Sequence, residues 1–174
     1  DGRRTGGLLS DHRGSGAAGR SFADGFHHAG TVTSYAGSMG NIEGAEWKFP
    51  IRYLYRRRMT DSAGAGKFRG GATIEVALTP HGVNGIALKL TNTAGTEQTN
   101  SHGIDGGYPG AGSQSAIVRA ADPAVLKQNT GKAPDIRALG GTLHWLPSKA
   151  DEVIREGDVY GFWAAGGGGF GDPL

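Results

Sequence analysis

Two adjacent histidines follow an aspartate in the segment Asp24-Gly25-Phe26-His27-His28-Ala29-Gly30. Neighbouring side chains of an extended chain point to opposite faces, so only one of the two histidines can face a given site. Imidazole and carboxylate groups together can form a metal or substrate site. Asp24, His27 and His28 are therefore candidate site residues, and a pair of solvated surface histidines is the alternative.

A second candidate is the glycine-rich stretch DSAGAGKFRGG at residues 61–71. Its first two residues, Asp61 and Ser62, favour a turn, and Lys67 and Arg69 follow among exposed amides. Such a loop could bind an anion through backbone N–H groups and two cations. The alternative is a structural turn with solvated charges. We also expect a positive φ in at least one of three glycines of this loop, namely Gly64, Gly66 and Gly70.

Other glycine-rich stretches do not match nucleotide-binding motifs. The segment Gly166–Gly169 is followed by Phe-Gly-Asp-Pro, whereas a Walker loop requires Gly-Lys-Ser/Thr and a helix. The GSGAAG stretch at 14–19 has no apolar strand before it. We expect these glycines to allow close approach of backbone segments.

Composition excludes several classes of protein. The 174 residues contain no cysteine, which excludes disulfides and thiolate chemistry, and their net charge of +2 gives no argument for nucleic acid binding. The dense basic run Arg56-Arg57-Arg58 is expected to be a solvated strand end. No apolar run approaches the length of a membrane span, and the first residues do not resemble a secretory signal. A cytoplasmic location, with no membrane partner, is the expectation.

Apolar residues alternate with polar or small ones in several segments, which predicts β-strands. Residues 73–79 and 85–90 flank a turn cluster and predict an antiparallel hairpin with one buried face, to which six side chains contribute: Ile74, Val76, Leu78, Ile86, Leu88 and Leu90. Further strands are predicted over 48–59, with Phe49, Ile51, Tyr53 and Tyr55 on one face, and over 142–146 and 158–163.

These elements predict an all-β fold, mainly an antiparallel sandwich or barrel-like domain, with glycine-rich loops and at most one or two short helices. One short helix is expected after Asp122-Pro123. Residues 1–46 fit the strand pattern poorly and are expected to form a glycine-rich irregular segment that packs on the sheet. Residues 47–174 are expected to form the β-rich domain.

The order of the motifs is similar to that in the C-terminal part of the hydantoinase B/oxoprolinase family. The chain runs through GSGAAG, DGFHHAGTVTS, GNIEGAEWKFPIRYLYRR, DSAGAGKFRGG and GGGGFGDPL. Glu43, Glu46 and Pro50 match an acidic element of the family. DSAGAGKFRGG and GGGGFGDPL resemble its two most specific signatures, with Ala63 and Phe170 as departures. A further departure is Thr31-Val32-Thr33, where the family has Thr-Asn-Thr.

The resemblance implies part of an ATP-dependent enzyme that hydrolyses the C–N bond of a cyclic amide of the hydantoin or 5-oxoproline class. One alternative is a ketone carboxylase of the acetone or acetophenone type, and another is a non-catalytic domain that serves assembly. The resemblance further implies a hydantoinase A-like partner subunit that uses ATP and Mg²⁺, together with the N-terminal part of the same B subunit, which would hold any divalent metal. In this setting His27 or His28, with Asp24, would transfer protons. Asp61, Ser62, Lys67 and Arg69 would bind an anionic intermediate formed from a small-molecule substrate.

Overall fold

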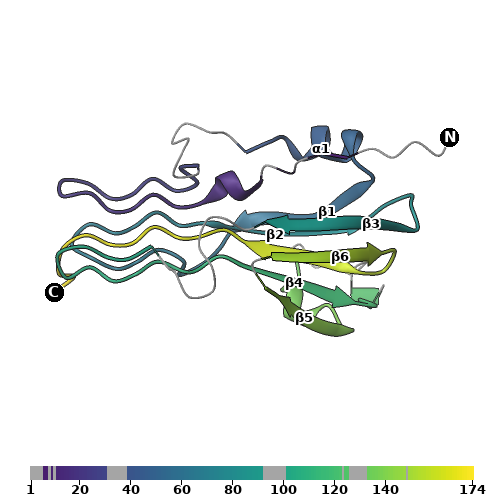
Figure 1. Cartoon of the computed structure of the whole chain (residues 1–174). Helices are drawn as coiled ribbons and strands as arrows, with labels where there is room; N and C mark the ends of the chain where they lie inside the picture. Colours follow the sequence, from purple (N-terminus) through teal and green to yellow (C-terminus); the bar gives the residue numbers. More distant parts are fainter. Residues whose placement is uncertain are drawn as a thin grey trace.

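The computed structural model describes residues 6–7, 9, 11–30, 39–91, 101–122, 124–125, 133–147 and 149–174. Its strands form a five-stranded antiparallel sheet in the order β1-β2-β7-β4-β5 and a two-stranded sheet of β3 and β6 (Figure 1). The strands are β1 (Ile51–Arg58), β2 (Ile74–Pro80), β3 (Gly85–Thr91), β4 (Gln114–Arg119), β5 (Thr142–Leu146), β6 (Lys149–Arg155) and β7 (Val159–Trp163). The helical elements are the 3₁₀ turns η1 (Asp11–Gly14) and η2 (Ile136–Ala138) and the helix α1 (Ile42–Lys48).

The two sheets lie face to face, so the predicted all-β sandwich with few short helices is confirmed. A core of apolar side chains lies between the sheets, with Ile74, Val76, Leu78 and Phe162 from the large sheet and Ile154 from β6. A second apolar cluster on the outer face of the large sheet is covered by Ile136 and Leu139. The described strands do not close into a barrel.

β2 and β3 do not form the predicted hairpin. β2 pairs with β1 and β7, whereas β3 pairs with β6 in the other sheet. The alternating side chains of both strands still meet in one core, because Ile86 and Leu88 pack against the cluster that contains Ile74, Val76 and Leu78. The side chain of Leu90 lies outside the described residues. The alternation of apolar side chains therefore predicted correctly which side chains face the core. It did not predict the pairing, because two strands in stacked sheets can show the same alternation as the two strands of a hairpin.

A β-bulge in β1 separates two tyrosines that were expected to share a face. Tyr53 pairs with Leu78 and Tyr55 with Ala77, so Leu54 is the extra residue. Tyr53 consequently packs against the core between the sheets, whereas Tyr55 belongs to the cluster on the outer face. The expectation of a common face was wrong because an inserted residue moves every later side chain to the opposite side.

The helix α1 was not predicted, and it occupies the start of the strand expected over 48–59. Asn41 caps it by accepting a hydrogen bond from the Glu43 N–H at 2.9 Å, and the chain leaves helical geometry at Phe49 before Pro50. The helix has seven residues, none of them buried, so it carries no apolar stripe by which to recognise it. The boundary expected at residue 46 falls within α1.

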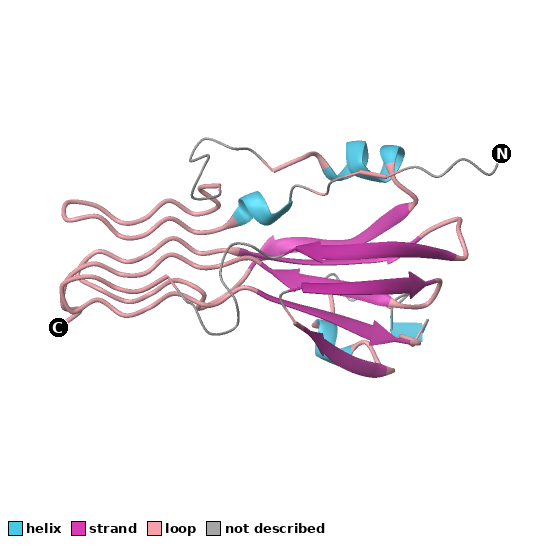
Figure 2. Ribbon diagram, in the orientation of Figure 1, coloured by secondary structure: helices cyan, strands magenta, loops and turns pink. Residues whose placement is uncertain are grey.

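A bundle of extended glycine-rich segments projects from one end of the sandwich (Figure 2). This glycine bundle comprises residues 14–19, 25–30, 62–66, 67–73, 101–104, 107–111 and 164–170. Their hydrogen bonds run from one segment to another, for example from Gly64 N–H to Gly167 C=O and from Gly19 N–H to Gly168 C=O, both at 2.8 Å. Extended chains without internal hydrogen bonds are typical of the polyproline II conformation.

The four glycines at 166–169 lie in the middle of the bundle, with neighbours on every side. An added Cβ would lie 1.7 Å from Ser62 C=O at Gly166, 1.8 Å from Ala17 C=O at Gly167 and 2.1 Å from His102 C=O at Gly168. At Gly169 it would lie 2.0 Å from the carbonyl oxygen of Ala65, in the segment that Gly166 also faces. This repeat of three residues is that of a polyproline II helix. It explains why four consecutive glycines are required.

The prediction of a positive φ at Gly64, Gly66 or Gly70 was wrong, since none of them has one. The residue with a positive φ in this loop is Asp61, at 52°. Glycine is needed here for space instead, because a Cβ at Gly70 would lie 2.0 Å from the Gly167 carbonyl oxygen.

Candidate functional site

The two segments that carry the predicted site residues lie side by side in the glycine bundle. Gly25 N–H donates to Arg69 C=O at 2.8 Å, and the Asp24 carboxylate accepts from Arg69 N–H at 2.8 Å. Further along, His28 N–H donates to Ala72 C=O at 3.3 Å. The structure thus brings Asp24, His27 and His28 together with the loop at 61–71. We call the two paired segments, residues 24–28 and 67–72, the histidine ladder.

His27 and His28 occupy different environments within this ladder. Nδ1 of His27 accepts the Ala72 N–H at 2.8 Å, so the neutral ring carries its proton on Nε2, on an exposed side chain. His28 is half-buried, has φ of 52°, and its buried Nε2 has no hydrogen-bond partner in the described part of the chain. Burial, reinforced by Arg58, His27 and Arg56, lowers the pKa of His28. His28 is therefore neutral at pH 7.

The four predicted anion-binding residues differ in exposure. Ser62 is only 1% exposed, and its hydroxyl donates to Met59 C=O at 2.8 Å and accepts from Thr73 N–H at 3.0 Å. The geometry thus gives Ser62 a structural role. Lys67 and Arg69 are both exposed, and a nitrogen of Arg69 lies 3.9 Å from an oxygen of the exposed Asp61. Lys67 and Arg69 are the pair able to reach an anion.

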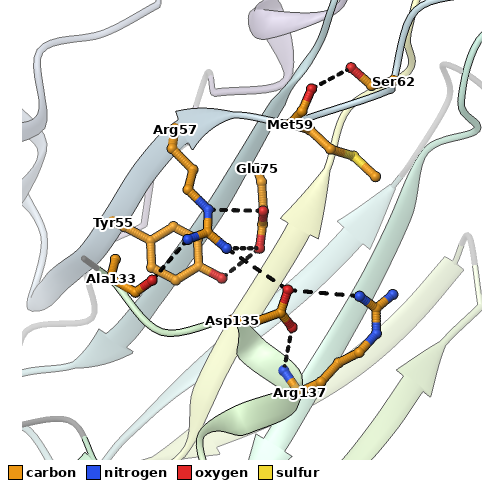
Figure 3. A network of polar contacts seen from close by, with 8 residues as sticks. All are labelled: Tyr55, Arg57, Met59, Ser62, Glu75, Ala133, Asp135 and Arg137. Carbon is orange, nitrogen blue, oxygen red and sulfur yellow. Dashed lines mark hydrogen bonds and ion pairs between the residues drawn. The ribbon is translucent and has the colours of Figure 1, made fainter. Parts of the chain in front are cut away.

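A network of charged groups on the outer face of the large sheet was missed from the sequence (Figure 3). Glu75 is 6% exposed and accepts hydrogen bonds from the Tyr55 hydroxyl at 2.7 Å and from Nε and Nη2 of Arg57 at 3.1 and 3.2 Å. Burial and the Glu75 hydrogen bond raise the pKa of Tyr55, so its hydroxyl stays protonated. Arg57 also donates to Ala133 C=O at 2.9 Å.

This network lines a pocket of about 580 Å³ between the end of β1 and η2. Asp135 lies between two arginines, with its Oδ2 3.9 Å from Arg57 Nη2 and 3.8 Å from Arg137 Nη1. The Arg137 guanidinium also lies over the rings of Trp145 and Trp163, at 5.7 and 5.9 Å. Hydrogen bonds to Glu75 and Ala133 hold the Arg57 side chain in place at this pocket.

The expectation that Arg56-Arg57-Arg58 is a solvated strand end was wrong for its first two residues. Arg56 pairs with the buried Asp11 at 2.8 Å, and Asp11 also accepts a hydrogen bond from the Tyr53 hydroxyl. Arg57 pairs with Glu75 on the opposite face. The one signal in the sequence was Glu75 itself, a charged residue in a strand that is otherwise apolar and small.

The described residues contain no cluster of three or more His, Asp or Glu side chains that could hold a metal ion. No helix among them has the length and apolar character needed to cross a membrane. Residues 31–33, the Thr-Val-Thr departure from the family pattern, lie outside the described part of the chain.

The comparisons with known proteins all point to the same family. Residues 3–173 match the family described as hydantoinase B/oxoprolinase. The chain is 30% identical over 169 residues to the acetone carboxylase alpha subunit of Xanthobacter autotrophicus (strain ATCC BAA-1158 / Py2), and the match covers 87% of the chain and 21% of that subunit. It is 28% identical over 161 residues to the caprolactamase subunit beta of Pseudomonas jessenii, covering 92% of the chain and 25% of that subunit.

Solved structures share the fold. A nucleotide-free structure of acetone carboxylase superimposes with a TM-score of 0.70 at 24% identity over 93% of the chain and 23% of the solved one. The structure of the ATP-dependent caprolactamase from Pseudomonas jessenii superimposes with a TM-score of 0.64 at 23% identity. The match covers 91% of the chain and 24% of the solved one. The chain therefore spans between a fifth and a quarter of the length of the relatives that it matches.

Proposed function

Because the chain belongs to the hydantoinase B/oxoprolinase family, we propose that it is the C-terminal domain of a B-type subunit in an ATP-dependent enzyme that hydrolyses the C–N bond of a cyclic amide. The match to a caprolactamase subunit supports this branch, because a lactam is a cyclic amide. The substrate is proposed to be a small cyclic amide of the hydantoin or 5-oxoproline class.

The observation that carries the proposal is the histidine ladder. It holds an exposed imidazole, His27, on one segment and the exposed cations Lys67 and Arg69 on the segment beside it. An anionic intermediate requires cations and a proton-transferring group within one site. Asp24 positions the ladder by accepting the Arg69 N–H, and Asp61 lies beside the Arg69 side chain.

The domain is proposed to form one wall of a larger site. ATP and Mg²⁺ would be bound by a hydantoinase A-like partner subunit, and any catalytic divalent metal by the N-terminal part of the B-type subunit. The described residues of this chain contain no cluster of His, Asp or Glu side chains that could hold a metal ion. A cytoplasmic location is part of the same proposal.

The test uses the complete enzyme, purified with its partner subunit. It would be incubated with ATP, Mg²⁺ and one of hydantoin, 5-oxoproline or caprolactam, and ring opening would be followed by chromatography together with ATP consumption. We expect ATP-dependent ring opening of at least one of these compounds. Absence of ring opening for all three would refute the proposal.

A second candidate function is ATP-dependent carboxylation of a ketone, which the match to the acetone carboxylase alpha subunit favours. The same enzyme would then convert acetone or acetophenone in the presence of bicarbonate and ATP. Incorporation of labelled bicarbonate separates this outcome from hydrolysis. A domain that serves assembly alone is a third alternative, and substitutions in the histidine ladder test it.

We predict that His27→Asn in the complete enzyme lowers kcat by about 10²-fold, the usual contribution of a general acid or base. Asparagine retains a side-chain acceptor for the Ala72 N–H, so the ladder itself should persist. His81→Asn is the matched control, because His81 is an exposed histidine in the turn after β2. Turnover of His27→Asn equal to that of the control would assign His27 a structural role.

Arg69→Ala is expected to lower turnover at least tenfold while leaving thermal unfolding nearly unchanged, because its side chain is exposed and its backbone makes the ladder bonds. Arg155→Ala, which removes an exposed arginine from β6, is the control. Normal turnover in both Arg69→Ala and Lys67→Ala would exclude the anion-binding role and favour the assembly alternative.

A further inference from the structure

The arm of the glycine bundle at residues 14–30 holds a half-buried arginine between two exposed aromatic rings. The Arg20 guanidinium lies 5.1 Å from the centroid of Phe22 and 4.6 Å from that of Phe26. Phe22 and Phe26 are 72% and 64% exposed. We call Arg20, Phe22 and Phe26 the aromatic tip. Phenylalanine and arginine are enriched at protein interfaces relative to the rest of the surface.

Arg20 has an unsatisfied hydrogen-bond donor within this tip. Its Nη2 donates to Asp24 C=O at 3.0 Å, but its buried Nε has no acceptor in the described part of the chain. A buried donor without an acceptor destabilises the isolated domain. Its Nη2 bond and the two rings hold the Arg20 side chain within the tip, with Nε shielded from solvent.

The backbone beneath the tip is fixed in place. Arg20 N–H bonds to Ala23 C=O at 2.8 Å, and Gly25 N–H and the Asp24 carboxylate bond to the backbone of Arg69. A backbone that is already ordered loses little conformational entropy on binding, so the backbone of this arm is preorganised for docking.

We propose that the aromatic tip docks into the part of the enzyme that the related subunits possess and these 174 residues do not span. The matched region is only 21% of the length of one relative and 25% of the other, so most of each related subunit lies outside it. The docking surface should present an apolar socket for the exposed rings of Phe22 and Phe26. This inference rests on one part of the proposed function, namely that the domain belongs to a larger enzyme.

Photo-crosslinking in the complete, purified enzyme tests the proposal. Phe22→p-benzoylphenylalanine and Phe26→p-benzoylphenylalanine place the probe at the tip, and Val153→p-benzoylphenylalanine places it on β6 at another exposed apolar residue. Mass spectrometry then identifies the crosslinked peptides. We expect both tip positions to crosslink to peptides of the B-type subunit that lie outside these 174 residues. The crosslinking yield at each tip position should be at least five times the yield at position 153.

A crosslink to the ATP-using partner subunit would overturn the assigned occupant, and yields no higher than at position 153 would overturn the docking itself. A second variant checks the role of the rings, because Phe26→Ser in the Phe22→p-benzoylphenylalanine background should reduce the crosslink several-fold, and an unchanged yield would contradict the socket. Ring-opening and carboxylation assays on the same preparation report separately on the proposed function.

Discussion

At the scale of single residues, Glu75 is the most consequential charge in the sandwich. Its carboxylate accepts hydrogen bonds from Tyr55 and Arg57, and Glu75→Ala would leave the Tyr55 hydroxyl without its acceptor and Arg57 with only the Ala133 carbonyl and the more distant Asp135. Breaking a buried ion pair from one side is strongly destabilising, so we expect a loss of about 3 kcal/mol in the free energy of unfolding. Urea denaturation measures it, with the exposed Glu156→Ala as control. A loss below about 1 kcal/mol would mean that water replaces the carboxylate.

Asp158 makes stability depend on pH. Burial alone would raise the pKa of this carboxyl group, but hydrogen bonds from Arg155 N–H, the Arg119 guanidinium and Ala120 N–H outweigh burial and lower it. A lowered pKa means that the stabilisation is complete above the unfolded value of 3.8 and is lost as the pH falls toward the folded value. We expect Asp158→Asn to be less stable than wild type at pH 7, with the difference shrinking below about pH 4. Urea midpoints at both pH values give the comparison, and a constant difference would contradict the linkage.

At the scale of elements, the core between the two sheets depends on β2 more than on β3. Ile74 is fully buried in that core, whereas Ile86 is half-buried at its edge. Ile74→Ala should therefore cost roughly 2–5 kcal/mol through lost contacts and a cavity, and Ile86→Ala clearly less. Chemical denaturation of the two variants provides the measurement. Equal losses would indicate that the small sheet is as tightly packed as the large one.

The sequence predicted the elements with clear alternation and missed the others for identifiable reasons. β1, β2 and β7 were expected from their pattern, but the partner of β2 was not, because pairing depends on long-range packing that alternation does not encode. In the candidate site, both loops were picked out by their residue types, and the structure places them side by side. The network of Tyr55, Arg57 and Glu75 was missed because a bulge at Leu54 turned Tyr55 to the other face.

At the scale of the whole molecule, the glycine bundle couples distant segments through contacts that tolerate no side chain. Gly167→Ala would push a methyl group against the Ala17 carbonyl oxygen, and we expect it to destabilise the protein by more than 3 kcal/mol or to prevent folding. Gly44→Ala in α1 is the matched control, since its Cβ would meet nothing closer than 3.9 Å. That change should stabilise the protein by up to about 1 kcal/mol. Thermal unfolding temperature and soluble yield of the two variants are the measurements. A small loss of stability in Gly167→Ala would contradict the close backbone packing around Gly167.

The position of residues 159–170 in the middle of both the sheet and the glycine bundle has a consequence for how the protein is made. β7 separates β2 from β4, and the glycines that follow contact the segments near residues 17, 62 and 102. All of these neighbours leave the ribosome before the segment that joins them. Until residues 159–170 emerge, the strand edges and glycine-rich segments that they contact remain unpaired and can form non-native contacts. Productive folding of this domain therefore waits until residues 159–170 have been synthesised.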